Sequence, residues 1–273
     1  MVRLITWNVA RRASRLVDQA GVVAAREPDF VGLQEVTRRT LPLWRRAFEL
    51  MGLTHVRASA TEGARAGAVG RRTFVMIGSR VALTDLDVPL ALPWPETAVS
   101  MLAQSSLGPL EINCVHVPNA ANGWVKVETL RALRHGLETR ARAPRVLCGD
   151  LNTPRRELPD GKTISFACDS RGRLRPDRGR DWDAAELGVV PASTTSDTAM
   201  RTGRYTDMSR RRRAGRGRRS QATTAAGGST TFSSPVSWLL SPANTTTTGA
   251  TRGSAITLLE TDFEGCRKSP GHS

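Results

Sequence analysis

Five polar side chains of this sequence follow short apolar runs that read as buried strands. They are two carboxylates, two amides and an imidazole: Asn8, Glu35, His116, Asp150 and Asn152. In layered α/β folds, functional groups collect where strands end. An oxygen-rich set without a thiol pair suits a hard cation such as Mg²⁺ or Mn²⁺ rather than structural zinc. The spacing therefore predicts a site for such a cation at the strand ends.

Each of these residues also has a purely structural alternative. Asn8 could bond the backbone of a turn, Glu35 could cap the segment before Thr37, and His116 could be a half-buried, satisfied histidine. The segment 149–152 (Gly-Asp-Leu-Asn) is harder to explain by packing, because it sets an acid beside a glycine between two leucines. Together, the four segments favour one site over several unrelated structural roles.

The elements that must position these residues alternate between strands and helices. Apolar runs predict strands at 2–9, 30–34, 73–79, 99–104, 111–115 and 145–148, and helical spacing predicts helices at 15–25, 40–50 and 124–137. Such interleaving is typical of an α/β layered fold. The strands at 99–104 and 111–115 are joined by a short Gly-Pro turn and look like a hairpin, so the sheet is expected to be mixed.

Four segments resemble a known family in their order and spacing. Thr6 to Val9, Leu33 to Val36, Val115 to Asn119 and Gly149 to Asn152 are similar to motifs of the endonuclease/exonuclease/phosphatase superfamily. Its members include exonuclease III-type and DNase I-type nucleases, sphingomyelinases and inositol polyphosphate phosphatases. The resemblance covers about residues 1–190 and implies a four-layer α/β sandwich, with two mixed sheets face to face and helices outside.

The resemblance also implies a role for each polar residue. Glu35 would be the main metal ligand, and Asn8 would orient Glu35 and help to hold metal-bound water or phosphate. Asp150 would position or deprotonate the attacking water. Asn152 would donate to a non-bridging phosphate oxygen, and His116 would protonate the leaving oxygen or contact the phosphate.

Three more residues take roles from the same resemblance. Glu96, just before the strand at 99–104, is placed like the acid that orients the catalytic histidine. Asn119 and Lys126 are expected to contact phosphate.

The sequence departs from the family after residue 191. The superfamily has two further motifs, one of the form Arg-Leu-Asp-His or Arg-Ile-Asp and a final Ser-Asp-His, and neither occurs here. The only histidine after His135 is His272, which has no aspartate beside it. Asp262 fits instead the strand that follows the last motif, so 259–273 is expected to hold a remnant of that strand.

Codon arithmetic suggests where the two motifs have gone. Gly227 to Phe232 can be encoded so that the frame starting at each third base reads Arg-Leu-Asp-His-Val. Gly253 to Leu258 gives Leu-Ser-Asp-His-Ser in that frame, and Asn244 to Thr248, with the first two bases of Gly249, gives Tyr-His-His-Asp-Trp between them. Apart from the choice between the two codon families of serine and of leucine, only the third bases are free. We therefore hypothesise that about 192–258 is translated out of frame, by paired frameshifts or by a sequencing error.

The composition of that segment agrees with a change of frame. Residues 192–258 hold fifteen threonines, clustered serine, alanine and glycine, and the run Arg210 to Arg213. Such a low-complexity, basic segment is expected to be disordered. The chain thus divides into an enzyme-like domain at 1–191 that lacks part of its second half, the segment 192–258, and the end 259–273.

The net charge of +15 suits a polyanionic partner, although an arginine-rich base composition would give a similar charge. The leading interpretation is a Mg²⁺-dependent phosphodiesterase, most simply a nuclease acting on DNA. One alternative keeps the fold and takes a lipid or sugar phosphate. Another is a non-catalytic, basic nucleic-acid-binding protein, favoured by the arginines at 210–219.

The remaining features concern the expected location and association state of the protein. No apolar run approaches the ~20 residues of a membrane span, and Met1 to Trp7 run directly into strand-like sequence, so neither an integral membrane protein nor a signal peptide is expected. Four cysteines are too few for a disulfide scaffold of this size. We expect a cytoplasmic monomer.

Overall fold

The computed structural model describes residues 2–59, 73–86, 90–106, 108–138, 143–158 and 163–189, together with the backbone of four strands beyond them. The first half contains β1 (Val2–Asn8), α1 (Leu16–Ala24), β2 (Phe30–Val36), α2 (Leu41–Leu50), β3 (His55–Ala58), β4 (Phe74–Ser79), β5 (Leu83–Asp85) and the 3-10 turn η3 (Pro95–Thr97). It is followed by β6 (Ala98–Ser105), β7 (Gly108–His116), η4 (Ala120–Asn122), α3 (Trp124–Glu138), β8 (Arg145–Asp150), β9 (Arg156–Glu157), β10 (Thr163–Ile164) and α4 (Gly179–Val189). The last four strands are β11 (Tyr205–Asp207), β12 (Thr245–Thr246), β13 (Ala250–Gly253) and β14 (Ile256–Phe263).

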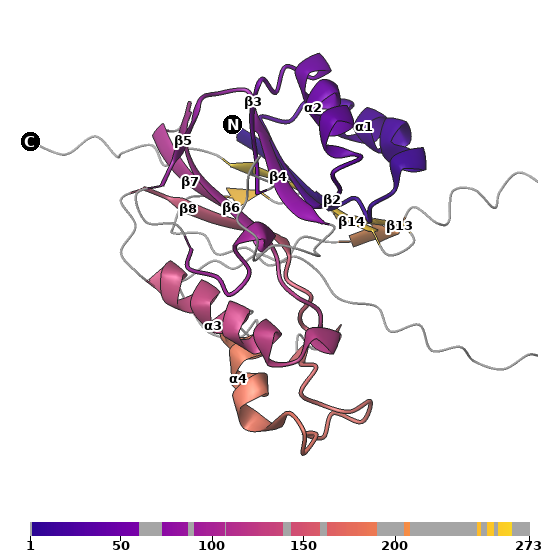
Figure 1. Ribbon diagram of the computed structural model, residues 1–273, viewed down its shortest axis with the longest axis vertical. Helices are drawn as coiled ribbons and strands as arrows, with labels where there is room; N and C mark the ends of the chain where they lie inside the picture. Colours follow the sequence, from indigo (N-terminus) through magenta and orange to yellow (C-terminus); the bar gives the residue numbers. More distant parts are fainter. Residues whose placement is uncertain are drawn as a thin grey trace, which may run out of the picture.

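Two mixed sheets lie between two pairs of helices (Figure 1). The larger sheet has the order β11-β13-β14-β1-β2-β4-β3, with β1 and β2 parallel and β2 and β4 antiparallel. The smaller sheet has the order β5-β6-β7-β8, with β6 and β7 antiparallel and β7 and β8 parallel. Helices α1 and α2 cover the larger sheet, and α3 and α4 lie at the opposite end of the molecule.

Three apolar cores separate the four layers. The central core joins the two sheets through side chains of β1, β2, β4, β6, β7 and β8, among them Leu4, Ile77 and Ile112. A second core packs the larger sheet against α1 and α2, and a third packs β7 and β8 against α3 and α4. Alternate strand residues supply the two faces of each sheet. The predicted four-layer α/β sandwich with two mixed sheets is therefore confirmed.

The predicted elements agree with the structure to within a few residues, with one difference in the hairpin. The strands β6 and β7 extend to Ser105 and Gly108, so the connection is tighter than predicted, and Gly108 has a φ of 96°. Such a left-handed conformation is open to glycine at little cost. Helix α4 was not predicted, although its buried Trp182, Ala185, Glu186 and Val189 follow helical spacing.

Part of the segment 192–258 is paired with the larger sheet. The backbone of β11, β13 and the first residues of β14 extends that sheet beyond β1, whereas the sequence predicted little regular structure there. Strand β14 pairs antiparallel with β1 and begins three residues before the predicted remnant at 259. The remainder of 192–258, including the shifted-frame segment at 227–232, lies outside the described residues.

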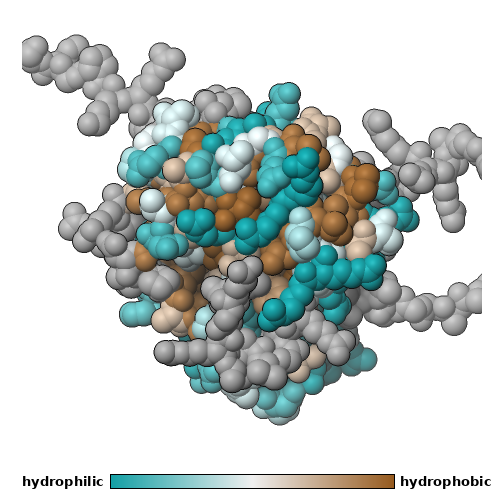
Figure 2. Space-filling view, turned by 45° about the horizontal axis from the view of Figure 1, so that its top comes forward, coloured by the Kyte–Doolittle hydropathy of each residue, from teal (hydrophilic) through white to brown (hydrophobic). Residues whose placement is uncertain are grey.

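Among the described residues, no helix is long and apolar enough to cross a membrane. On the face drawn in Figure 2, apolar areas lie between strongly polar side chains. Large exposed apolar residues include Val17 on α1 and Leu43 and Leu50 on α2. Scattered apolar side chains of this kind are normal on a protein surface.

Candidate active site

Two parallel strand pairs deliver the predicted site residues to one edge of the sandwich. In β1 and β2, Asn8 is the partner of Gln34, which places Glu35 one residue further on. In β7 and β8, His116 is the partner of Asp150. Since the carboxyl ends of parallel strands share an edge, each pair brings its two polar residues together. The contacts described below then join the two pairs across the central core.

The amide of Asn8 bridges two carboxylates. Its Nδ2 donates to Asp150 Oδ2 at 2.8 Å and lies 3.3 Å from Glu35 Oε1. Its Oδ1 accepts from the backbone N–H of Ala10 at 2.9 Å, which fixes the orientation of the amide. Residues from β1, β2 and β8, up to 142 positions apart in the chain, therefore meet at one side chain.

Glu35 lies at an irregular point of β2. The pairing of β2 with β4 shifts between Leu33 and Val36, and Glu35 has a φ of 58°, which is uncommon for a residue with a Cβ. Its Oε2 lies 3.1 Å from Arg11 Nε, and its Oε1 lies 3.9 Å from His116 Nε2. The side chain of Glu35 is about one fifth exposed, so solvent reaches this carboxylate. The irregularity turns it out of the regular strand alternation and toward the site.

The turn after β8 holds Asp150 and Asn152 in fixed positions. Asp150 Oδ1 accepts from the backbone N–H of Asn152 at 3.0 Å. Asn152 has a φ of 49°, is buried, and donates from Nδ2 to Val117 O at 2.8 Å. Val117 in turn donates its backbone N–H to Asp150 O at 2.8 Å. This turn is therefore tied to the segment that follows β7 by two hydrogen bonds.

The backbone at Gly149 explains why a glycine precedes Asp150. Its φ is 132°, and a Cβ at this position would lie 1.9 Å from Val115 O. Only glycine lets β8 approach β7 this closely at the residue before Asp150. The glycine thus sets the separation of His116 and Asp150.

Two other predicted residues lie at the start of nearby elements. Glu96 is in η3, where its backbone carbonyl accepts from Ser59 Oγ at 2.6 Å, two residues before the start of β6. Asn119 precedes η4, and its Oδ1 accepts from Ala121 N at 3.1 Å and from Asn122 Nδ2 at 2.8 Å. The side-chain oxygen Oδ1 of Asn119 is therefore engaged locally, and its side-chain nitrogen Nδ2 is the group that it can offer to a phosphate.

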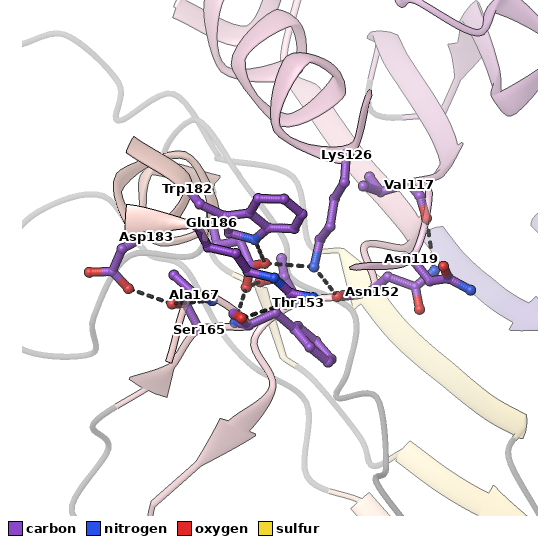
Figure 3. Close-up of polar contacts among 12 residues, drawn as sticks. Val117, Asn119, Lys126, Asn152, Thr153, Ser165, Ala167, Trp182, Asp183 and Glu186 are labelled. Carbon is purple, nitrogen blue, oxygen red and sulfur yellow. Dashed lines mark hydrogen bonds and ion pairs between the residues drawn. The ribbon is translucent and has the colours of Figure 1, made fainter. Parts of the chain in front are cut away.

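Lys126 occupies a different position from the one predicted. It is completely buried, and its Nζ donates to Glu186 Oε1 at 2.7 Å and to Asn152 O at 2.8 Å (Figure 3). Burial lowers the pKa of Lys126, while the charge of Glu186 opposes the shift. An ammonium group enclosed in this way is not available to a phosphate. The sequence prediction failed because a lysine is almost never fully buried unless it is paired, and its partner lies 60 residues later.

Two residues near the site were missed by sequence reasoning. Arg11 pairs with Glu35 from an exposed turn in which Ala10 and Arg11 both have positive φ values, and no sequence pattern announces that geometry. Glu186 could have been found, because it is a carboxylate at a helical spacing of four residues from Trp182, among apolar neighbours.

The donor chemistry of the site fits a hard divalent cation. Two carboxylates, Glu35 and Asp150, converge on the amide of Asn8, and their charge is matched only in part by the exposed Arg11. Within the described ranges, no three His, Cys, Asp or Glu side chains form a group that could hold a metal by themselves. Solvent or substrate oxygens would have to complete the coordination, and Asn8 could add its amide oxygen only after its side chain turns.

A model of the Endonuclease/Exonuclease/phosphatase family matches residues 5–255. The chain belongs to this family. Its description places the chain among hydrolases of phosphate esters, nucleases included. No curated protein sequence matches the chain.

Several solved structures are similar to the chain at low sequence identity. Truncated TDP2 from Caenorhabditis elegans is 16% identical, with 96% of each chain covered and a TM-score of 0.50. An AP endonuclease from Archaeoglobus fulgidus is 23% identical, with 68% of this chain and 70% of that chain covered and a TM-score of 0.47. An endonuclease/exonuclease/phosphatase from Beutenbergia cavernae is also 23% identical, with 58% and 49% covered and a TM-score of 0.44.

Proposed function

We propose that this family member is a metal-dependent phosphodiester hydrolase that acts on DNA. The observation that carries the proposal is the bridge from Asn8 to both Glu35 and Asp150. It places a ligand carboxylate and a second carboxylate around one amide at the open edge of the sandwich. His116, whose Nε2 lies 3.9 Å from Glu35 Oε1, adds an imidazole that can donate a proton.

In this proposal, side chains of the protein position the attacking water and transfer the protons. Mg²⁺ or Mn²⁺, held by Glu35 and Asn8, would supply stabilisation of the negative charge that builds on the phosphate. Asp150 orients the attacking water and takes its proton as the new P–O bond forms. His116 donates a proton to the leaving oxygen as the old P–O bond breaks, and the resemblance to the family assigns Glu96 to orient it.

Two amides hold the phosphate in this mechanism. The bond from Asn152 Nδ2 to Val117 O uses one of its two hydrogens, and the other is offered to a non-bridging phosphate oxygen. Asn119 contributes its Nδ2 from the loop after β7. Both groups are neutral donors, so they stabilise the transition state without adding charge near the carboxylates.

The charge of the chain supports DNA as the substrate. Residues 1–191 contain 28 basic and 20 acidic side chains, so the part of the chain that carries the site has an excess of positive charge. A polyanion is attracted to such a protein before any specific contact forms. A lipid or sugar phosphate would be held mainly by the site itself and would depend less on ionic strength.

We further propose that the chain with this sequence is an impaired form of the enzyme. The Ser-Asp-His motif is absent, and under the frameshift hypothesis codons can be chosen for 253–258 that encode it in the shifted frame. Within the described residues β8 ends the order of the smaller sheet, with no further strand beside it. A frame-corrected chain would supply the missing motif and, with the shifted-frame segment at 227–232, the residues for such a strand.

A cleavage assay on the frame-corrected chain tests the proposed site. We expect Mg²⁺-dependent cleavage of duplex DNA that stops with a chelator, and a loss of about 10² to 10³ in rate or more in Glu35→Gln and in Asp150→Asn. Glu49→Gln is the matched control, because Glu49 is an exposed carboxylate on α2 that pairs with Arg46. Full activity in both site variants would reject the site, and turnover of lipid or sugar phosphates alone would reject DNA.

A further inference from the structure

We propose that Lys126 and Glu186 form a buried positioning pair that holds the turn carrying Asp150 and Asn152. The proposal rests on the proposed function for the meaning of that turn, and on the contacts of Figure 3 for its mechanics. Neither residue touches a substrate in this account. They act through the backbone and the hydroxyl group of the turn.

Glu186 is the centre of the contacts. Its Oε1 accepts from Lys126 Nζ at 2.7 Å and from Trp182 Nε1 at 2.6 Å. Its Oε2 accepts from Thr153 Oγ1 at 2.7 Å and from Phe166 N at 2.9 Å. The carboxylate therefore joins α3, α4, the turn after β8 and the segment after β10 while being completely buried.

Lys126 makes the second connection to the turn. Its Nζ donates to Asn152 O at 2.8 Å and lies 4.2 Å from the centre of the Phe166 ring. The turn is thus held at two consecutive residues, by Lys126 at Asn152 and by Glu186 at Thr153. Both holding groups are charged and their hydrogen bonds are correspondingly strong.

These bonds determine where the site groups of the turn point. With its carbonyl oxygen fixed by Lys126, Asn152 directs its backbone N–H to Asp150 Oδ1 and its side-chain amide to Val117 O. Its positive φ costs free energy that the surrounding contacts must offset. Loss of the buried pair would release the carbonyl oxygen of Asn152 and let its backbone leave the positive-φ conformation. The Asp150 carboxylate would then lose the backbone N–H of Asn152 as a fixed donor.

A positioning role explains the pair better than stability alone. Removing two charges from water is expensive, and well-packed apolar residues in the same place often give equal or greater stability. What an apolar pair cannot supply is the directed hydrogen bonds to Asn152 O and Thr153 Oγ1. The double variant Lys126→Met/Glu186→Leu removes those bonds without leaving an unpaired buried charge.

Hydrogen exchange on the chain as it exists tests the positioning without any need for activity. We expect the amides of Leu151 to Thr153 to exchange at least tenfold faster in the double variant, with cooperative unfolding retained. The matched control is Arg145→Met/Glu111→Leu, which removes another largely buried ion pair, 2.7 Å long, at the opposite end of β8. Exchange at 151–153 should not change in that control.

A kinetic measurement on the frame-corrected chain connects the positioning to the site. The double variant should lower kcat at least tenfold and change KM less than twofold, because the turn acts on the reacting groups rather than on DNA affinity. Unchanged exchange in a folded double variant overturns the proposal, and so does faster exchange with full kcat. Faster exchange in a protein whose corrected parent cleaves nothing rejects the proposed function and leaves the positioning intact.

A second variant keeps the proposal testable if the double variant does not fold. Thr153→Val removes only the hydroxyl bond to Glu186 Oε2 and keeps the volume of the side chain. Faster exchange at 151–153 in Thr153→Val supports the proposal, and unchanged exchange there overturns it.

Discussion

The two sides of the candidate site are built in different ways. On the β8 side, Asp150 and Asn152 are fixed by neighbouring backbone groups and by the fully buried Lys126 and Glu186. On the β2 side, Glu35 is held by the side chains of Asn8, His116 and Arg11, and Arg11 is 63% exposed.

In the proposed mechanism, this difference matches the groups that must keep still and the groups that must exchange partners. A residue that orients water or a phosphate oxygen gains from a rigid support, because preorganised groups need not reorganise in the transition state. A metal ligand must release its protein partners when the cation binds. The exposed, screened contact of Arg11 with Glu35 can be given up at little cost.

The largest expected effect is on the β8 side, in Gly149→Ala. The new Cβ would lie 1.9 Å from a backbone oxygen at a φ of 132°, so both overpacking and backbone strain should destabilise the fold by more than about 4 kcal/mol in total. On the other strand pair, Gly32→Ala meets the side-chain sulfur of Cys114 at 2.7 Å, which can shift, and should cost clearly less. Urea unfolding measures both, with Gly21→Ala as the control because its Cβ would be in open space on α1. Equal losses at 149 and 32 would contradict the contrast.

A smaller effect on the free energy of unfolding is expected when the ion pairs Lys126–Glu186 and Arg11–Glu35 are compared. Lys126→Met leaves Glu186 charged and buried, so it should lower the free energy of unfolding by about 3 to 5 kcal/mol. Arg11→Met removes an exposed contact and should change it by less than about 1 kcal/mol. Denaturant titration of the two single variants tests this, and a stable Lys126→Met would show that the buried pair is not a support.

The smallest effect comes from adding the metal. Free Mg²⁺ at about 100 times its dissociation constant should stabilise the folded chain by about 2.7 kcal/mol, seen as a rise in Tm. Glu35→Gln should abolish the gain, whereas Arg11→Met should keep it at lower Mg²⁺, because Arg11 no longer competes for the carboxylate. The same gain in Glu35→Gln as in the parent would place the cation elsewhere.

The sequence predicted the strand ends well because the signal there is local. A buried apolar run followed by a polar residue reports both the strand and the place where its side chain leaves the sheet, as at Asn8 and Asp150. The order of these segments then matched a known family. The layers followed, since each strand and helix has one apolar face to bury.

The sequence did not predict the features that depend on distant partners. The resemblance implied a phosphate contact for Lys126, and only the position of α4 shows that Glu186 pairs with it instead. The contact of Arg11 with Glu35 requires two successive positive φ values in a chain without glycine there. Both are determined by tertiary packing, which residue types and spacing do not encode locally.

The most direct test compares this chain with its frame-corrected form in one cleavage assay, with and without a chelator. The two proteins differ only at about residues 192–258, and the Arg-Leu-Asp-His and Ser-Asp-His motifs are the part of that difference with a direct role at the proposed site. We predict Mg²⁺-dependent cleavage of duplex DNA by the corrected chain and a rate lower by at least about 10² to 10³ in the present one. Equal rates would show that the site works without those motifs and would contradict the account.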